Sequence, residues 1–252
     1  MGFYDLSKSE RTRLVNTINR EIYEAVSRTR LIGIHPYFSD EDTYIRKTAY
    51  LSIGKLYKNT PELRTKILKI LNQSLKSNNP KVRQTTINAA GEIGMGNFEV
   101  VRHFLEVGLF DNHHSVRNAV IGSVKKMGAK NPIPTLKWAK KYLGHPDKEI
   151  RREICHGIEL RGRTHPQDIL PLLEKLQHDE TSRVRNTLIH VLGQIAYKKG
   201  CLETVVGALK TWKNTELVKS ALDEIVDVHH RYASFAFLSQ QQAITYIDEN
   251  YS

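Results

Sequence analysis

The chain is poor in cysteine, methionine and tryptophan, with 2, 3 and 2 of them among 252 residues. Its cysteines, Cys155 and Cys201, are too few for a disulfide scaffold and do not form a paired metal-ligand motif. No stretch approaches the roughly 18 consecutive apolar residues of a spanning helix, and the first residues lack the apolar segment of a signal peptide. We therefore expect a cytoplasmic protein without a membrane partner.

Motifs for metal and cofactor chemistry are missing as well. Glycine-rich phosphate loops and serine or cysteine triad signatures are absent. There is no His-Glu dipeptide, and the adjacent pairs His113-His114 and His229-His230 are expected to point to different faces of a helix. The sequence thus predicts no metal site and no cofactor.

Positive charge, by contrast, is abundant: 38 Lys and Arg stand against 27 Asp and Glu, a formal net charge of +11. This surplus favours polyanionic partners such as nucleic acid. It is uneven, because residues 113–219 hold 20 Lys and Arg but 10 Asp and Glu. The predicted nucleic-acid-binding residues cluster at expected helix ends and are Lys125, Lys126, Lys130, Lys137, Lys140, Lys141, Arg161, Arg163, Lys198 and Lys199.

A short motif repeats along the chain. A β-branched residue followed by a basic one recurs six times, from Ile45-Arg46 to Val218-Lys219, at spacings of 37, 34, 34, 34 and 34 residues. Apolar residues follow at helical spacing, as Val184, Leu188 and Leu192 show. The repeat predicts a pair of helices in each unit and no strands.

The repeat also predicts the architecture. One helix pair of this size cannot bury its apolar face, whereas stacked pairs share a continuous core. We expect an all-α protein, a right-handed α-solenoid of about six helix-pair repeats, forming a single domain over residues 1–252. Residues 1–36 are expected to form an N-terminal cap, residues 37–231 the repeats and residues 239–250 a C-terminal capping helix.

The loops before the repeated basic residues carry a second pattern. In Asp111-Asn112-His113-His114-Ser115-Val116-Arg117, and again over residues 179–185, an acidic residue stands six positions before the arginine. These segments resemble the HEAT repeat, and the resemblance extends over roughly residues 38–230. It implies that the repeated arginines pair with the acidic residue of a neighbouring loop and fix repeat stacking. We therefore do not predict them as nucleic-acid contacts.

A narrower resemblance lies in the second half of the chain. Residues 150–157, 169–176 and 184–190 resemble the bacterial alkylpurine DNA glycosylases built from HEAT-like repeats. The resemblance implies a basic concave channel for double-stranded DNA and a carboxylate that assists loss of a cationic base. The chain departs from the pattern at three positions, because His156 and Gln194 stand where acids are expected and His190 stands where one branch of the family carries a tryptophan.

The predicted catalytic candidates lie beside the expected core face. Glu153 and Glu92 are the carboxylates that could replace the missing acid, and His156 and His190 could titrate near neutrality. An amide such as Gln194 cannot supply the negative charge that stabilises an oxocarbenium-like centre. Base excision is therefore expected to be lost or altered.

Functions of different classes remain open on this evidence. One is a DNA-binding protein related to the alkylation-repair glycosylases, gripping the duplex backbone with its basic half. Another is a non-enzymatic scaffold for a protein partner, and a chromophore-lyase-like HEAT protein is a third. Binding to DNA that weakens steeply with salt would favour the first. A protein partner retained after nuclease treatment would favour the scaffold.

Overall fold

The computed structural model describes residues 2–251, and in that range the chain forms helices and no strand. The predicted all-α helical-repeat solenoid is confirmed. The chain divides into two compact units, unit 1 (Met1–Asn131) and unit 2 (Pro132–Ser252); the single-domain organisation stays a prediction. Among the described residues, no helix combines the length and apolar character that a membrane crossing needs.

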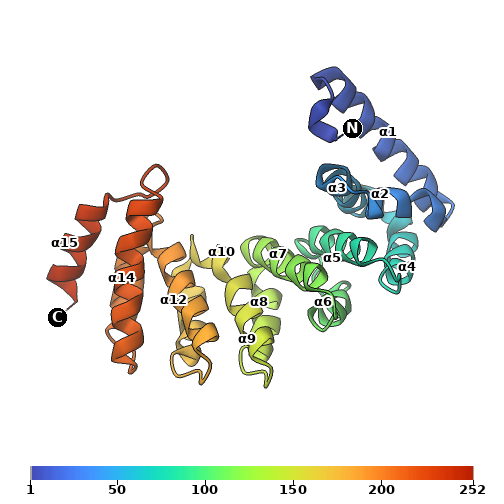
Figure 1. Cartoon of the computed structure of the whole chain (residues 1–252). Coiled ribbons are helices and arrows are strands. Elements are labelled where there is room, and N and C mark those ends of the chain that lie inside the picture. The colour runs from blue at the N-terminus through green and yellow to red at the C-terminus, as the bar shows by residue number, and fades with distance from the viewer. Residues whose placement is uncertain (1, 252) are drawn as a thin grey trace. The chain divides into compact units, whose positions relative to one another are not determined.

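Unit 1 builds two layers of helices. In one layer α1, α3, α5 and α7 pack in succession, and in the other α4 packs on α5 while α6 packs on α5 and α7 (Figure 1). Ile87, Phe104 and Val120 are fully buried between the layers. The elements are η1 (Phe3–Asp5), α1 (Lys8–Ser27), η2 (Leu31–Gly33), α2 (His35–Ser39), α3 (Thr43–Asn59), η3 (Pro61–Leu63), α4 (Arg64–Ser74), α5 (Pro80–Gly94), α6 (Arg102–Leu109) and α7 (His114–Lys130).

Unit 2 continues the pattern with α9, α12, α14 and α15 packed in succession. In the repeat that begins at Arg151, the second helix is interrupted at Ile158. The helix α9 therefore ends at Gly157, and the short α10 begins at Glu159. Glycine lowers helix propensity at this point. The elements are α8 (Pro132–Tyr142), α9 (Lys148–Gly157), α10 (Glu159–Gly162), α11 (Pro166–Leu173), η4 (Glu174–Leu176), α12 (Ser182–Ala196), α13 (Leu202–Leu209), α14 (Thr215–Arg231) and α15 (Gln240–Asn250).

The first and last of these long helices start at capping boxes. The Ser7 hydroxyl accepts from the backbone N–H of Glu10 at the start of α1, while the Glu10 carboxylate accepts from the N–H of Ser7. Ser239 and Gln242 make the same reciprocal pair at the start of α15. The helix expected over residues 239–250 is thus α15.

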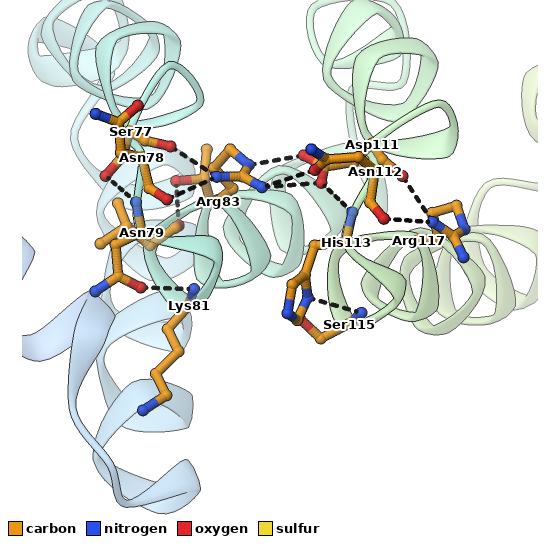
Figure 2. Close-up of polar contacts among 12 residues, drawn as sticks. Ser77, Asn78, Asn79, Lys81, Arg83, Asp111, Asn112, His113, Ser115 and Arg117 are labelled. Atoms are coloured by element: carbon orange, nitrogen blue, oxygen red, sulfur yellow. Dashed lines mark hydrogen bonds and ion pairs between the residues drawn. The ribbon is translucent and has the colours of Figure 1, made fainter.

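The repeated arginines fasten the loops between successive repeats, as the HEAT resemblance implies. Arg83 donates to the carbonyl oxygens of Ser77 at 2.8 Å and Asn78 at 3.2 Å, and its Nε and Nη2 reach the Asp111 carboxylate at 2.7 and 3.0 Å (Figure 2). Arg117 of the next repeat donates to the Asp111 carbonyl at 2.8 Å. Two arginines thus hold one loop from both sides.

The same arrangement recurs in unit 2. Arg151 donates through Nε and Nη2 to the Asp179 carboxylate at 2.6 and 2.9 Å, and Arg185 donates to the Asp179 carbonyl. These guanidinium groups are largely enclosed, since the side chain of Arg151 is 10% exposed. Their bonds serve the fold, which supports leaving the repeated arginines out of the nucleic-acid contacts.

Candidate nucleic-acid interface and histidine cluster

Unit 1 contains a hollow of about 840 Å³ where α3, α5 and α7 end. Three exposed lysines line it, Lys55 and Lys58 from α3 and Lys130 from the last residue of α7. Cations are favoured at helix C-termini because unpaired carbonyl groups concentrate negative potential there. Within the described residues these three ammonium groups form no ion pair, so their charge faces solvent.

One wall of the hollow carries a carboxylate that is already neutralised. Glu92 accepts from Lys126 Nζ at 2.6 Å, and the Glu92 side chain is 11% exposed. The same ammonium lies 5.1 Å from the centre of the Tyr50 ring. The structure therefore brings together three of the predicted site residues, Glu92, Lys126 and Lys130. Of these, Glu92 and Lys126 form an ion pair with each other. Lys125 lies next to Lys126 on α7 and is half-buried.

The lysines predicted in unit 2 separate into two kinds. Lys198 and Lys199 follow the end of α12 and lie over aromatic rings, 4.3 Å from the centre of Tyr197 and 5.5 Å from the centre of Phe237. The other kind lies on the solvent side of α8 without a carboxylate partner among the described residues. These exposed lysines are Lys137, Lys140 and Lys141.

Both arginines in the predicted set are engaged inside the protein. Arg161 forms an ion pair with Asp168, with nitrogen to oxygen distances of 2.7 and 2.6 Å. Arg163 forms an ion pair with Glu159 and donates to Gln194 Oε1 at 2.8 Å. Among the residues predicted to bind nucleic acid in unit 2, these arginines are therefore less available to a ligand than the exposed lysines of α8.

The structure assembles three side chains around the interruption between α9 and α10. Nε2 of His156 lies 3.1 Å from Oε2 of Glu159, and the ring of His190, from α12, is 6.0 Å from that of His156, centre to centre. One nitrogen or oxygen from each residue lies within 4.8 Å of the other two. Glu159 is buried, with a side chain 2% exposed, whereas those of His156 and His190 are 33% and 44% exposed.

The polar network behind Glu159 is incompletely satisfied. Gln194 is 4% exposed, and its Nε2 has no hydrogen-bond acceptor among the described residues. The same holds for Nε of Arg163, whose Nη2 holds both Glu159 and Gln194. A buried donor without an acceptor costs about 1–3 kcal/mol. An ordered water, a bound ion or a functional role can satisfy or explain such groups.

A hollow of about 440 Å³ gives solvent access to this cluster. His156 and His190 line it together with Arg152 and Arg183. Both arginines are paired with Glu149, at 2.9 Å from Arg152 Nε and 3.4 Å from Arg183 Nη1. The remaining lining residues are Ser182, Asn186 and Thr187.

The predicted catalytic carboxylates belong to different units. Glu153 is 2% exposed and lies 3.5 Å from Arg152 Nη2, in unit 2. Glu92 belongs to unit 1. Of the four predicted catalytic residues, His156 and His190 have ring centres 6.0 Å apart, and Glu153 stands three residues before His156 on α9. Glu159, the third residue of the cluster with His156 and His190, was not predicted. Helical spacing alone does not show that the helix is interrupted between α9 and α10.

The expectation that adjacent histidines point to different faces of a helix is wrong for His113 and His114. The rings of His113 and His114 stack, with centres 4.8 Å apart, because His113 is the N-cap of α7 and not part of the helix. Its Nδ1 accepts from the backbone N–H of Ser115. In the other pair, His229 is buried and its Nδ1 bonds the Ile225 carbonyl, whereas His230 is exposed.

Comparison with known proteins supports the fold. A family model described as "non-SMC mitotic condensation complex subunit 1" matches residues 31–99. No curated protein matches the sequence. Among solved structures, AlkD2 from Streptococcus mutans is similar at 16% identity and a TM-score of 0.57, covering 81% of this chain and 97% of AlkD2.

A second solved structure places the fold among larger solenoids. A chain in the structure of Kap95p with RanGDP is similar at 15% identity and a TM-score of 0.51, covering 96% of this chain and 36% of that one. At these identities the similarity concerns the fold alone. The chain has a HEAT-like helical-repeat fold similar to that of AlkD2, as the sequence predicted.

Proposed function

We propose that this protein binds double-stranded DNA through the phosphate backbone and does not excise bases. The observation that carries the proposal is the hollow of unit 1, where Lys55, Lys58 and Lys130 converge without carboxylate partners. Lysine ammonium groups on a surface bind phosphates by charge and need no base-specific geometry.

Charge distribution supports the same reading. Residues 1–131 hold 21 Lys and Arg against 12 Asp and Glu, and residues 132–252 hold 17 against 15. Unit 1 thus has the larger net surplus, because the positive residues 132–219 of unit 2 are partly offset by residues 220–252, with 5 Asp and Glu against 1 Arg. In unit 2 the exposed lysines of α8 supplement it, namely Lys137, Lys140 and Lys141.

The carboxylates argue against base excision. A glycosidic transition state needs a negative group beside the developing positive charge. Glu92 is neutralised by Lys126 at 2.6 Å, and Glu153 is buried beside Arg152. Neither offers an accessible anion to a substrate.

The test of DNA binding uses the full chain and a labelled duplex, with affinity measured by fluorescence anisotropy between about 50 and about 200 mM salt. Each phosphate contact contributes about −0.9 to the slope of log affinity against log salt, or about a 3- to 4-fold loss across this range. Lys55→Gln/Lys58→Gln/Lys130→Gln is expected to weaken binding and flatten the slope by about 2 to 3.

The matched control removes the same charge elsewhere. Lys69, Lys76 and Lys175 are exposed and line none of the hollows described above. Changing all three to Gln is expected to leave the slope nearly unchanged. Equal effects of the two triple variants would show attraction by net charge only and contradict the proposed interface. No binding of duplex at low salt would refute DNA as the partner.

Release of methylated bases from alkylated DNA tests the second half of the proposal. We expect no release by the wild-type chain at enzyme excess. Release that disappears in Glu92→Gln or Glu153→Gln, with DNA binding retained, would overturn it and identify that carboxylate as catalytic.

A specific surface supports protein binding as a second candidate. After α14, Phe235 and Phe237 are 71% and 56% exposed, next to Tyr232 at 37%. Exposed aromatic clusters often mark protein contact sites. If the protein is a scaffold, Phe235→Ser/Phe237→Ser is expected to abolish capture of a protein partner in nuclease-treated pull-downs. If it binds DNA, the same variant is expected to leave the salt dependence of DNA affinity unchanged.

A further inference from the structure

We propose that His156, Glu159 and His190 form a binding site for one divalent transition-metal ion, with zinc as the best fit. The three side chains come from α9, α10 and α12, and one donor atom from each lies within 4.8 Å of the other two. Two imidazoles and one carboxylate are a donor set that Zn²⁺ accepts, with a fourth position left for water or another ligand.

The existing distances are close to what a metal requires. Zinc binds nitrogen at about 2.0–2.1 Å and carboxylate oxygen at about 2.0–2.2 Å, so two ligand atoms of a tetrahedral site lie about 3.3 Å apart. His156 Nε2 and Glu159 Oε2 are 3.1 Å apart. The ring of His190 must approach further. Its side chain is 44% exposed, so a side-chain rotation can bring it in.

The surroundings supply the second layer of contacts that metal sites need. Arg163 holds the other carboxylate oxygen of Glu159 and is itself bonded to Gln194 at 2.8 Å, which fixes the orientation of the carboxylate. Glu224 Oε1 lies 3.6 Å from Nδ1 of His190. This distance is beyond a hydrogen bond, and a small approach of the ring would let the carboxylate accept from Nδ1, which directs the other nitrogen toward the metal.

Charge and access are also compatible with a cation. The two arginines of the hollow, Arg152 and Arg183, are both paired with Glu149, so they oppose an incoming cation less than free guanidinium groups would. The hollow itself connects the two histidines to solvent. An ion can therefore enter, and its fourth position would face the hollow.

The ordinary alternative is a hydrogen bond between His156 and Glu159 with His190 nearby by chance. The two readings differ in measurable ways. The two rings meet edge to face, at 71° and 6.0 Å between their centres, which is a common aromatic contact, so measurement and not geometry decides between the readings. A metal also replaces a proton, so its binding must release protons and weaken as the pH falls.

The experiment titrates the chelator-treated full chain with Zn²⁺ by calorimetry and with Co²⁺ by visible absorption. We expect one ion per chain and the absorption of four- or five-coordinate Co²⁺. His156→Gln and His190→Gln should each abolish the stoichiometric binding. Because Glu159 is buried and its substitution can disturb folding, the two exposed histidines carry the test. Circular dichroism verifies that the variants fold.

Two further variants sharpen the result. Glu224→Gln removes the carboxylate beside His190, which also pairs with Arg231 at 2.7 Å, and is expected to weaken metal binding by about 10- to 100-fold without abolishing it. His178→Gln changes an exposed histidine outside the cluster and should bind as the wild type does. Absence of stoichiometric binding in the wild type, or undiminished binding in both cluster variants, would overturn the site.

Discussion

At the scale of single residues, Asp179 shows how one side chain joins successive repeats. Its carboxylate accepts from Arg151 and from the backbone N–H of Thr181 at 2.9 Å, while its carbonyl accepts from Arg185. Burial by itself would raise the pKa of Asp179, but the hydrogen bonds from Arg151 and Thr181 hold it below the usual value. The ionised form is therefore the one that the folded state prefers.

The substitution Asp179→Asn tests this coupling. A group whose pKa is lowered on folding stabilises the native state above its unfolded pKa of about 3.9, and this stabilisation is lost as the pH falls through the folded pKa. We expect the variant to lose about 1–3 kcal/mol of unfolding free energy at pH 7. Urea unfolding at a series of pH values should show that the difference in unfolding free energy between the wild type and the variant narrows only below about pH 4.

An exposed carboxylate provides the comparison. Asp248 lies on the solvent side of α15, and Asp248→Asn is expected to change stability by no more than about 0.5 kcal/mol. A loss in Asp179→Asn that is independent of pH would mean that shape, and not charge, is the quantity that Asp179 contributes.

At the scale of elements, helix contacts depend on where glycine permits a close approach. A Cβ atom at Gly91 of α5 would lie 2.4 Å from Ser123 Oγ and 3.2 Å from Ser123 Cα of α7. No side chain fits there without separating the two helices. On the same α7, Gly122 is exposed, and a Cβ there would have no atom within 4 Å.

These two glycines give opposite expectations for the same substitution. Gly91→Ala should destabilise the protein by about 1–3 kcal/mol because it overpacks the α5–α7 contact. Gly122→Ala should stabilise it by up to about 1 kcal/mol because alanine is the better helix former. Thermal or urea unfolding of both variants distinguishes the effects. A stabilised Gly91→Ala would show that the helices can move apart at little cost.

At the scale of the whole molecule, the net charge of +11 is shared unequally between the units. Surface lysines of any basic protein attract DNA over long range, but only those in contact lose access to reagents. We therefore expect reductive methylation in the presence of duplex DNA to spare Lys55, Lys58 and Lys130. Lys69 and Lys76 should react as in the free protein, with mass spectrometry as the readout.

The pattern of protection decides between contact and general attraction. Uniform weak protection of all exposed lysines would contradict the proposed interface. Protection confined to Lys137, Lys140 and Lys141 would move the interface to α8 of unit 2.

Much of the fold could be predicted because its signals are local and repeated. The basic residue of each repeat, such as Arg83 or Arg151, stands at a near-constant period, and an acid six residues before the next arginine marks its partner. Helical spacing and capping residues such as Ser7 depend on a few neighbouring positions. Local patterns of this kind can be recognised without any knowledge of the tertiary structure.

The candidate sites were predicted less completely because they depend on contacts between residues that are distant in the sequence. His156 and His190 were both foreseen as candidates, but their partner Glu159 enters through the break between α9 and α10. Lys55 and Lys58 were not foreseen, because each alone resembles an ordinary lysine near a helix C-terminus. Only the hollow shared with Lys130 distinguishes them.

By itself, the sequence determined a HEAT-like helical-repeat chain with a positive surplus and arginines that fasten its loops. These properties follow from periodicity and composition, which are written along the chain. The tertiary structure decided which distant side chains meet: Glu92 with Lys126, Arg163 with Gln194, and the histidine cluster with its carboxylate. These contacts depend on helix interruptions and on packing distances of a few ångströms, and the spacing of residues along the chain does not specify either.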